Sequence, residues 1–569
     1  MDKQVLNKKR LTSVLVLLAA FIAINLISGE FYTRIDLTKE KRHSLTSASE
    51  QMIKDINDIV FIKIYLKGDF PAGFKRLANA TADLLEEFRS YNPHYIEYEF
   101  IDPFEGVTDP KESQNIIVQL AEKGLKPTNI KSIGNAGQEQ TYIFPSALIT
   151  YQGNEIPVNL LHSQLGISPA QALNNSVSGL EYSFISGIRK VLTPIKPKVG
   201  MLSGQGQIQD QFVYDFIKSM GEFYEVEKIA MNDSLMYIPK QFKTIIVAQP
   251  TKAFSQKHKF IIDQYIMNGG SVLWLIDPII AAMDSLQGKE GFPIVPMDLN
   301  LDDQLFQYGA RLNKNLIQDV QCAPHPFSTG YMGNVPQFEL FEWLYYPVVI
   351  PDSKHPIVNN MDAVLHQFVS SIDTVGPSSI KKTPLLKTSK YSRSLFTGAR
   401  VSHNIIRNKP EPGMFNQTHL TTAVLLEGNF QSLYKSRSNA SFVNAIKQST
   451  GIDFKTQTED GKMIVVADGD MIKNGFDRQG NVYPCGFYKY TGQQFSNKKF
   501  LMNCVEYLSG VKVIEANSKS VTLRPLDTKR IEKEKSYWKF LNLLLPIVII
   551  LIFRIVFIYI RFLKYKSNE

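Results

Sequence analysis

Two long apolar segments, one near each end, constrain what this chain can fold into more than any other feature. From Leu11 to Ile27 the sequence carries no charge over 17 residues, and from Phe540 to Ile560 it carries one charge, at Arg554. As α-helices these segments would measure about 26 Å and about 32 Å, against a bilayer hydrocarbon core of about 30 Å. The sequence therefore predicts two membrane-spanning helices, at residues 11–28 and 538–560.

The first segment admits two interpretations, an uncleaved anchor or a cleaved signal peptide. Basic residues precede it, at Lys3, Lys8, Lys9 and Arg10, which places the tail 1–10 in the cytoplasm by the positive-inside rule. A signal peptide has the same basic and apolar regions but ends in small residues. Here the bulky Leu26 and Ile27 stand at the exit, and no cysteine follows for a lipid anchor. We expect an uncleaved anchor.

The second segment has the flanks of a membrane helix. Tyr537 and Trp538 stand where an interfacial aromatic belt belongs, and the basic tail 561–569 lies beyond. Arg554 either snorkels toward that tail or pairs with an acidic group on a partner's membrane helix. With both tails cytoplasmic, the body between the spans would lie across the bilayer, in the periplasm of a bacterial inner membrane.

Composition narrows the class of the body. At 569 residues the chain is long enough for about three to four domains, and its 21% charged and 44% apolar residues are ordinary for a globular protein. A net charge of +9 without a basic stripe disfavours nucleic-acid binding. The three cysteines, Cys322, Cys485 and Cys504, lack metal or redox spacing; a 485–504 disulfide and free buried thiols both remain open.

The first part of the body, residues 30–180, is predicted to be an α/β domain. Ser44 or Thr46 is expected to begin a helix, and strands at 59–66 and 95–101 flank a helix with apolar residues at helical spacing, from Phe74 to Phe88. This βαβ unit resembles a thioredoxin-like half without its cysteines. Strands at 141–151 and 155–160 would complete the domain, and a helix over 181–192 would link it to the next.

The second part, residues 195–525, alternates strands and helices as a doubly wound parallel sheet does. Strands are predicted at 198–202, 223–229, 244–248 and 271–276, with helices at 209–220 and 255–267. Residues 322–420 are expected to be an irregular insertion. Strands at 421–426 and 463–467 and a helix at 495–508 would rejoin the sheet, and 526–537 would form a stalk into the second span.

Candidate ligand-binding residues follow the strands, since parallel sheets place ligands at the strands' carboxyl ends. Ser203-Gly204-Gln205-Gly206-Gln207 lies between a strand and a helix, where phosphate-binding loops sit, but it lacks the full glycine fingerprint and the P-loop Lys. A structural turn, a cleft wall and a nucleophilic Ser203 are the alternatives, although no GxSxG elbow is present.

Three aspartates form a second candidate group. Asp468 and Asp470 follow one predicted strand and Asp277 follows another, so together they could bind a divalent cation through oxygen ligands. Strand-end turns explain them equally well. The nine histidines show no HExxH motif, and no Walker motif occurs. We therefore expect no catalytic residue, no metal and no cofactor.

Short motifs occur along nearly the whole chain, at residues 34–38, 44–46, 101–103, 144–148, 198–204, 269–270, 276–278, 308–309, Asp319, 355–357, 385–389, 426–428, Ser432, Arg437, 466–470, Asn497, Asn503 and 523–525. In this order they resemble the gliding-motility GldG proteins and the wider family of ABC-transporter auxiliary proteins. The resemblance implies an amidotransferase-like α/β domain without a catalytic cysteine. Where relatives often read Gly-His-Gly-Glu, this chain reads Gly204-Gln205-Gly206-Gln207, so a charge-dependent role for that loop is not expected here.

The resemblance also implies a non-enzymatic subunit that works with a separate ABC permease and a separate ATPase in gliding and envelope secretion. A membrane-anchored periplasmic hydrolase and a purely structural scaffold of an envelope machine are the alternatives.

Overall fold

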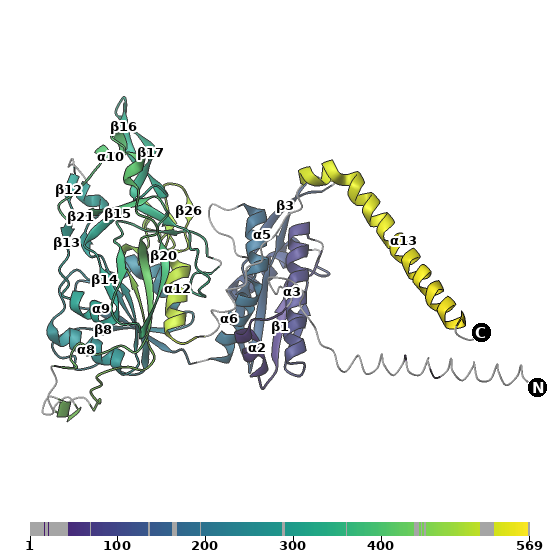
Figure 1. Cartoon of the computed structure of the whole chain (residues 1–569), viewed down its shortest axis with the longest axis horizontal. Coiled ribbons are helices and arrows are strands. Elements are labelled where there is room, and N and C mark those ends of the chain that lie inside the picture. Colours follow the sequence, from purple (N-terminus) through teal and green to yellow (C-terminus); the bar gives the residue numbers. More distant parts are fainter. Residues whose placement is uncertain are drawn as a thin grey trace, which may run out of the picture. The chain divides into compact units, whose positions relative to one another are not determined.

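The computed structural model describes residues 44–511, apart from short gaps at 69, 108, 135–136, 162–167, 194, 287–290, 360 and within 437–450, together with 528–566, Val16 and Phe21. The chain divides into two compact units, Met1–Ser520 and Val521–Glu569 (Figure 1). Apart from Val16 and Phe21, the predicted first span, 11–28, lies outside the described residues, as does the start of the predicted N-terminal domain, 30–43.

The first part of the larger unit runs from α2 to α6. Its elements are α2 (Ser47–Lys54), β1 (Val60–Ile64), α3 (Ala72–Tyr91), β2 (Ile96–Phe100), α4 (Pro110–Glu122), β3 (Thr128–Gly134), β4 (Gly137–Ile143), β5 (Ser146–Tyr151), β6 (Asn154–Asn159), α5 (Pro169–Ser178) and α6 (Leu180–Leu192). Side chains of Thr46, Asp109 and Ser168 accept hydrogen bonds from backbone N–H groups in the first turns of α2, α4 and α5.

Four of these strands form one sheet, in the order β2-β1-β5-β6. β1 and β2 are parallel, as the predicted βαβ unit requires, while β5 is antiparallel to both β1 and β6. Buried residues of β1 and β5 pack against α3 and α6 in one core, which includes Leu77, Phe88, Phe184 and Ile188. Thr150 pairs with Phe61, so the returning hairpin closes the sheet on the side of β1 opposite β2.

The second part begins at β7 and ends at α12. Its elements up to the long hairpin are β7 (Lys198–Ser203), α7 (Asp210–Met220), β8 (Glu225–Ala230), β9 (Phe242–Ala248), α8 (Gln256–Met267), β10 (Ser271–Leu275), β11 (Ile279–Ile280), η1 (Met283–Leu286), β12 (Gly291–Pro293), β13 (Val295–Pro296), α9 (Asp302–Tyr308), β14 (Ala310–Leu312) and β15 (Asn315–Asp319).

From the hairpin onward the elements are β16 (Cys322–Met332), β17 (Val335–Val349), β18 (Val364–Leu365), β19 (Ile372–Thr374), β20 (Ile380–Lys387), β21 (Ser392–Phe396), β22 (Arg400–Ser402), α10 (Asn404–Arg407), η2 (Pro412–Met414), β23 (Thr421–Gly428), β24 (Gly461–Val466), η3 (Asp470–Ile472), β25 (Phe487–Tyr488), β26 (Gln493–Gln494) and α12 (Asn497–Leu508).

Seven strands form the central sheet, in the order β20-β23-β24-β10-β9-β7-β8. The five strands from β24 to β8 are parallel, as predicted. β23 and β20 are antiparallel additions at one edge, so the expectation of a wholly parallel sheet is wrong there. A run of apolar residues predicts a buried strand but not its direction, so the sequence carried no signal for this difference.

The central strands are buried on both faces. Alternate residues, such as Val272 and Trp274, join a core with α8 and α9, whereas Leu273 and Leu275 join a second core with α7 and α12. Because each face needs apolar residues, such strands read as continuous apolar runs in the sequence.

The expectation that the segment 322–420 is irregular is wrong. It contains a long hairpin, β16 and β17, and the short strands β18–β22. They contribute to a further core that is rich in aromatic residues and includes Trp343, Tyr345 and Phe368. Prolines at 324, 326, 336 and 347 lie within the hairpin strands and disguise them in the sequence, since proline normally signals an edge or a break.

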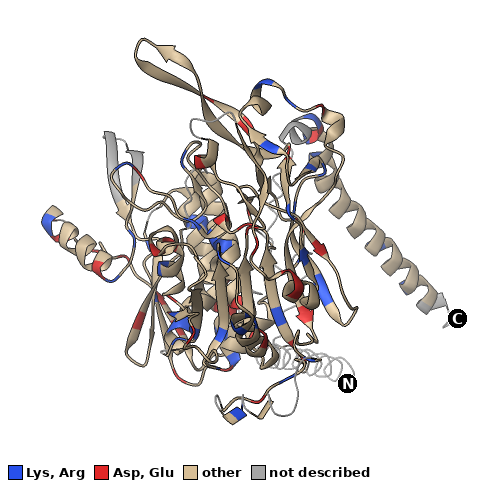
Figure 2. Cartoon of the chain, turned by 90° about the vertical axis from the view of Figure 1, so that its left-hand side faces the viewer, with Lys and Arg blue, Asp and Glu red and all other residues tan. Residues whose placement is uncertain are grey.

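The outer part of this hairpin extends away from the body as an arm, residues 328–340, which Figure 2 shows as a largely uncharged ribbon. Its large apolar side chains are exposed, with Tyr331 at 75%, Met332 at 73% and Phe338 at 62%. Glu339 is the one charged residue between Phe327 and Phe341. An apolar surface of this kind is unusual on a protein that works alone.

The smaller unit contains one long helix, α13 (Thr528–Lys566), with Pro546 inside it. Its stretch Lys533–Leu563 is long and apolar enough to cross a membrane, with a mean hydropathy of 3.0 over its most apolar 18-residue window, and it is the single such helix among the described residues. The predicted second span, 538–560, lies within it.

Candidate functional site

The carboxyl edge of the central sheet gathers the loops that follow its parallel strands. In the sheet, Leu275 of β10 lies beside Ala248 of β9 on one side and Val466 of β24 on the other. Gln249, Asp277 and Asp468 follow these three strands by one or two residues, so their side chains emerge at the same edge. The structure thus brings together the aspartates that the sequence had singled out.

Asp277 is held by two loops at once. Its Oδ1 accepts a hydrogen bond from the backbone N–H of Gly469 at 2.6 Å, and its Oδ2 accepts one from Nε2 of Gln249 at 2.8 Å. The same amide nitrogen lies 2.6 Å from Oδ1 of Asp470, which also forms an ion pair with Lys473. Gln249 therefore bridges the two carboxyl groups of Asp277 and Asp470.

Gln249 was not among the sequence candidates. Its backbone has a φ of 48°, in the left-handed region that a non-glycine residue rarely occupies. In this conformation the side-chain amide, which has two N–H donors, reaches the carboxyl groups of both Asp277 and Asp470. A left-handed backbone conformation next to a predicted strand leaves no signal in the sequence, apart from the pair Gln249-Pro250, which indicates a turn.

Asp468 is completely buried and belongs to a different set of contacts. Its Oδ2 lies 2.9 Å from Nδ1 of His366 and accepts the backbone N–H of Gln367 at 3.0 Å, while its Oδ1 accepts that of Asp470 at 2.9 Å. Nε2 of His366 in turn lies 3.0 Å from Oγ1 of Thr422. Both oxygens of Asp468 are thus occupied inside the protein.

Burial raises the pKa values of two carboxyl groups at this edge. Removal from water, and then the charges of Asp470 and Asp468, raise the pKa of Asp277 to about 8. Burial also raises the pKa of Asp470, an effect that the Lys473 ammonium group opposes. A carboxyl group that keeps its proton near neutral pH is a poor cation ligand. Among the described residues no three His, Cys, Asp or Glu side chains gather as a metal site would require.

Raising the pH from about 5 to about 8 is therefore expected to destabilise the protein through Asp277. The unfolded carboxyl has a pKa of about 3.9, so between that value and about 8 the folded state binds the extra proton, and stability falls as the pH rises. In Asp277→Asn, which cannot ionise, the loss should shrink by at least about 1 kcal/mol, given about 1.4 kcal/mol for each pKa unit. Denaturant unfolding of the full chain in detergent at both pH values measures this, and an unchanged pH dependence in the variant would contradict it.

The loop Ser203–Gln207 has contacts of its own. Gln205 is buried; its backbone carbonyl accepts the N–H groups of Thr251 and Lys252, both at 2.9 Å, and its Nε2 lies 3.0 Å from Nδ1 of His258. Oε1 of Gln207 accepts the N–H of Gln205 at 2.7 Å. Oγ of Ser203 donates to the carbonyl of Ile229 at 3.4 Å. These contacts fit a structural turn, because Ser203 faces a carbonyl rather than a base.

Gly204 is expected to be essential for this turn. Its φ is 114°, and a Cβ placed there would lie 2.7 Å from the carbonyl oxygen of Met231. Gly204→Ala should therefore cost more stability than Gly153→Ala, whose φ of 82° is also positive but whose Cβ would meet nothing within 4 Å. The difference should be about 1–3 kcal/mol, the usual cost of overpacking, in matched thermal unfolding curves. Equal losses would mean that backbone strain alone decides.

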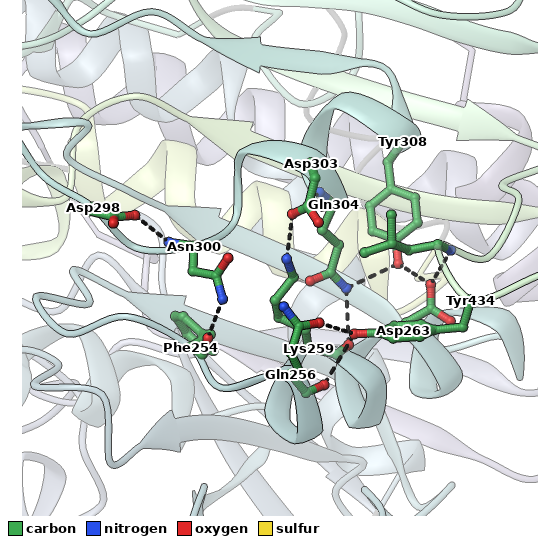
Figure 3. Close-up of polar contacts among 11 residues, drawn as sticks. Phe254, Gln256, Lys259, Asp263, Asp298, Asn300, Asp303, Gln304, Tyr308 and Tyr434 are labelled. Atoms are coloured by element: carbon green, nitrogen blue, oxygen red, sulfur yellow. Dashed lines mark hydrogen bonds and ion pairs between the residues drawn. The ribbon is translucent and has the colours of Figure 1, made fainter. Parts of the chain in front are cut away.

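A further buried network was missed in the sequence (Figure 3). Asp263 of α8 accepts hydrogen bonds from the hydroxyls of Tyr308 at 2.8 Å and Ser432 at 2.6 Å, and from the N–H of Leu433 at 3.0 Å. One turn earlier on the same helix, the fully buried Lys259 forms an ion pair with Asp303 of α9. These contacts fasten α8, α9 and the segment after β23 together.

Several motif residues that carry the family resemblance turn out to be partners within such contacts. Tyr308 and Ser432 share Asp263, and Asp319 accepts the N–H and the hydroxyl of Ser389 at 2.7 Å and 2.6 Å. Asn503 donates to the carbonyl of Ile357 at 2.7 Å. These motifs therefore maintain the fold, which does not require any of them to act on a substrate.

The cysteines are free. Cys485 and Cys504 are both buried and neither forms a disulfide, so the 485–504 bridge that the sequence left open is not formed. Burial raises the pKa of the Cys485 thiol to about 12, which keeps it protonated and unreactive.

Residues 196–504, more than half of the chain, match the protein family described as an ABC-type uncharacterized transport system. The chain belongs to this auxiliary family of ABC-type transporters. Residues 39–150 match a domain of unknown function. An uncharacterized protein of Borreliella burgdorferi is 21% identical over 450 residues, which cover 77% of this chain and 80% of that one. The solved mmIFT52 N-terminal domain aligns with a TM-score of 0.31 and 11% identity, over 55% of this chain and 97% of that domain. Family membership indicates a transporter-associated, non-catalytic role.

Proposed function

We propose that this chain is a non-enzymatic, membrane-anchored subunit of an ABC-type transporter complex. The observation that carries the proposal is its membership of the auxiliary family over residues 196–504. Because the sequence has no Walker motif, a separate ATPase subunit would hydrolyse ATP, and a separate permease would form the pathway.

The geometry of the candidate site supports a non-enzymatic role. A catalytic group needs a free donor or acceptor aimed at the space where a substrate would lie. Here Asp277 and Asp468 accept hydrogen bonds from other loops, and Ser203 donates to Ile229. The polar residues at this edge therefore hold loops together.

α13 would anchor the protein in the membrane. In our proposal it crosses the bacterial inner membrane at about 538–560, after a stalk at 526–537, and a first span at 11–28 crosses in the opposite sense. Both tails would be cytoplasmic and the body, with its domains at 30–180 and 195–525, periplasmic. The sheet order β2-β1-β5-β6 favours a thioredoxin-like first domain, and the central parallel sheet favours an amidotransferase-like second one.

The arm 328–340 supports contact with another protein. Aromatic and Met side chains are enriched at the centres of protein interfaces, while Lys and Glu are depleted, and the arm has that composition. Its two-stranded ribbon would leave backbone groups unpaired in a bilayer, which disfavours lipid as the partner.

Affinity purification of the tagged full chain from native membranes in mild detergent tests the proposal. A permease and an ATPase should be recovered with it, and a tagged, unrelated two-span protein serves as the control. Recovery of neither subunit would refute the proposal. A scaffold without a substrate predicts in addition that candidate substrates do not raise the unfolding temperature of the chain, since a ligand that binds only the folded state must stabilise it.

The finer assignment, to a GldG-type component of gliding motility and adhesin secretion, rests on the collinear motifs. Deleting the gene in a gliding bacterium should abolish surface spreading and leave growth in liquid medium unchanged. Normal spreading would confine the protein to a different transporter of the same family.

A further inference from the structure

Arg554 occupies a position in α13 that a membrane helix does not give to a cation without a reason. Between Lys539 and Arg561 it is the single charged residue, and it lies seven residues, or about 10 Å along the axis, from Arg561. Placing an unpaired arginine well inside the hydrocarbon costs at least about 2.5 kcal/mol. Such residues normally face a partner.

The geometry of the helix hinders the side chain of Arg554 from snorkelling to the nearer membrane interface. The Cα–Cβ bonds of a helix tilt toward its N-terminus, so the side chain of Arg554 starts out toward the middle of the span and away from Arg561. Snorkelling is easiest when the tilt and the nearer interface agree, and here they disagree. The guanidinium group therefore stays at depth unless it turns back along the helix.

The helix itself offers this guanidinium no acceptor. The residues three and four positions away are Ile550, Leu551, Phe557 and Ile558, all apolar and all at least half exposed. The carbonyl that Pro546 frees is that of Asn542, about 18 Å away along the axis. Five N–H donors are thus left for a group outside α13.

A second copy of this chain cannot supply that group. Neither apolar segment, 11–27 or 540–560, contains an Asp or Glu, so both lack a counter-ion at membrane depth. Two α13 helices packed through this face would bring two arginines together. The acceptor has to belong to a different protein, and a carboxylate matches the planar fork of guanidinium best.

We propose that Arg554 forms an ion pair with an Asp or Glu on a membrane helix of the permease subunit. This inference rests on the proposed function, which supplies the second membrane protein. The pair would fix how α13 is rotated against its neighbour, because an arginine on the wrong face would leave both charges unpaired in hydrocarbon.

A charge moved around the helix tests the inference. In Arg554→Leu/Ile555→Arg the composition, the hydropathy and nearly the depth stay the same, but the charge rotates by about 100°. In Arg554→Leu/Ile558→Arg the charge stays on roughly the same face and moves about 6 Å toward the interface, where snorkelling becomes easier. Full-length variants are purified from native membranes, and the recovered permease is quantified against the wild type. Carbonate extraction confirms that each variant is inserted.

We expect Arg554→Leu and Arg554→Leu/Ile555→Arg to recover at least tenfold less permease than the wild type. Suppressors that restore recovery to Arg554→Leu should replace an Asp or Glu in a permease helix by a neutral residue. If the wild type recovers the permease and Arg554→Leu/Ile555→Arg recovers an equal amount, the ion pair is overturned and the proposed function stays intact. A photo-cross-linker at residue 557 that labels only lipid would also overturn it. If the wild type recovers no permease, the proposed function fails, and the ion pair with it.

Discussion

Replacing Asp468 with alanine is expected to lower the free energy of unfolding by about 3–5 kcal/mol, because each buried donor left without its acceptor costs about 1–3 kcal/mol. The carboxylate is completely buried, contacts Nδ1 of His366 at 2.9 Å, and accepts the N–H groups of Gln367 and Asp470. Without it, one imidazole and two backbone donors lose their partner in a place that water does not reach. Chemical denaturation of the full chain in detergent measures the change.

Two further variants make this result specific. Asp468→Asn keeps the shape and one acceptor, so its loss should be smaller than that of Asp468→Ala. Asp477 also accepts several hydrogen bonds, from Gln479 and Asn481, but it does so in a solvated turn. Asp477→Ala should therefore cost far less. Similar losses for Asp468→Ala and Asp477→Ala would show that the contact between Asp468 and His366 adds nothing.

The sequence predicted the parallel strands of the central sheet because burial on both faces demands unbroken apolar runs. Residues 244–248 and 271–276 had been predicted as strands, and β9 and β10 lie there. Helices α7 and α8 follow in the same way, with Ser255 capping α8 by accepting the N–H of His258. These elements are determined by local composition and spacing.

The long hairpin could not be predicted by the same reasoning. Proline and glycine in β16 and β17 mimic a loop, and the pairing of Cys322 with Pro347 across the hairpin has no counterpart in local sequence. The ladder also contains two shifts of register, between Cys322 and Pro324 and between Ser328 and Gly330, which the local sequence does not reveal.

The candidate site was predictable in its placement but not in its chemistry. Parallel strands end at one edge, so Asp277 and Asp468 were expected near each other. That Gln249 bridges Asp277 and Asp470, and that His366 contacts Asp468, depends on residues up to 221 positions apart in the chain. Sequence spacing carries no information on such contacts.

The second large effect is expected at a buried ion pair between α6 and α12. The side chain of Glu506 is fully buried, and its Oε1 accepts a hydrogen bond from Arg189 at 3.0 Å. The Arg189 side chain is 14% exposed, and its guanidinium carbon lies 4.8 Å from the ring centroid of Phe223. Glu506→Ala should destabilise the protein by about 3–5 kcal/mol, because it leaves a buried cation without its counter-ion.

The double variant Arg189→Met/Glu506→Met removes both charges and fills the space with apolar side chains. Exchanges of this kind are often neutral or stabilising, so its stability should lie close to that of the wild type. A double-mutant cycle with the two single Met variants then gives the coupling energy. Additive losses in the cycle would mean that the two side chains contribute through separate contacts rather than through the ion pair.

The two single variants should also differ in their dependence on pH. Burial already raises the pKa of Glu506, and Arg189 opposes that shift, so in Arg189→Met the pKa rises further. The carboxyl group can then take up a proton, and Arg189→Met should lose less stability at pH 5 than at pH 8. An arginine cannot escape in this way, because it stays charged at every pH in reach. Unfolding at both pH values should therefore show a loss that grows from pH 5 to pH 8 for Arg189→Met. For Glu506→Ala, which removes the carboxyl group with the raised pKa, the loss should not grow over this range, and the reverse pattern would refute a buried carboxylate at this position.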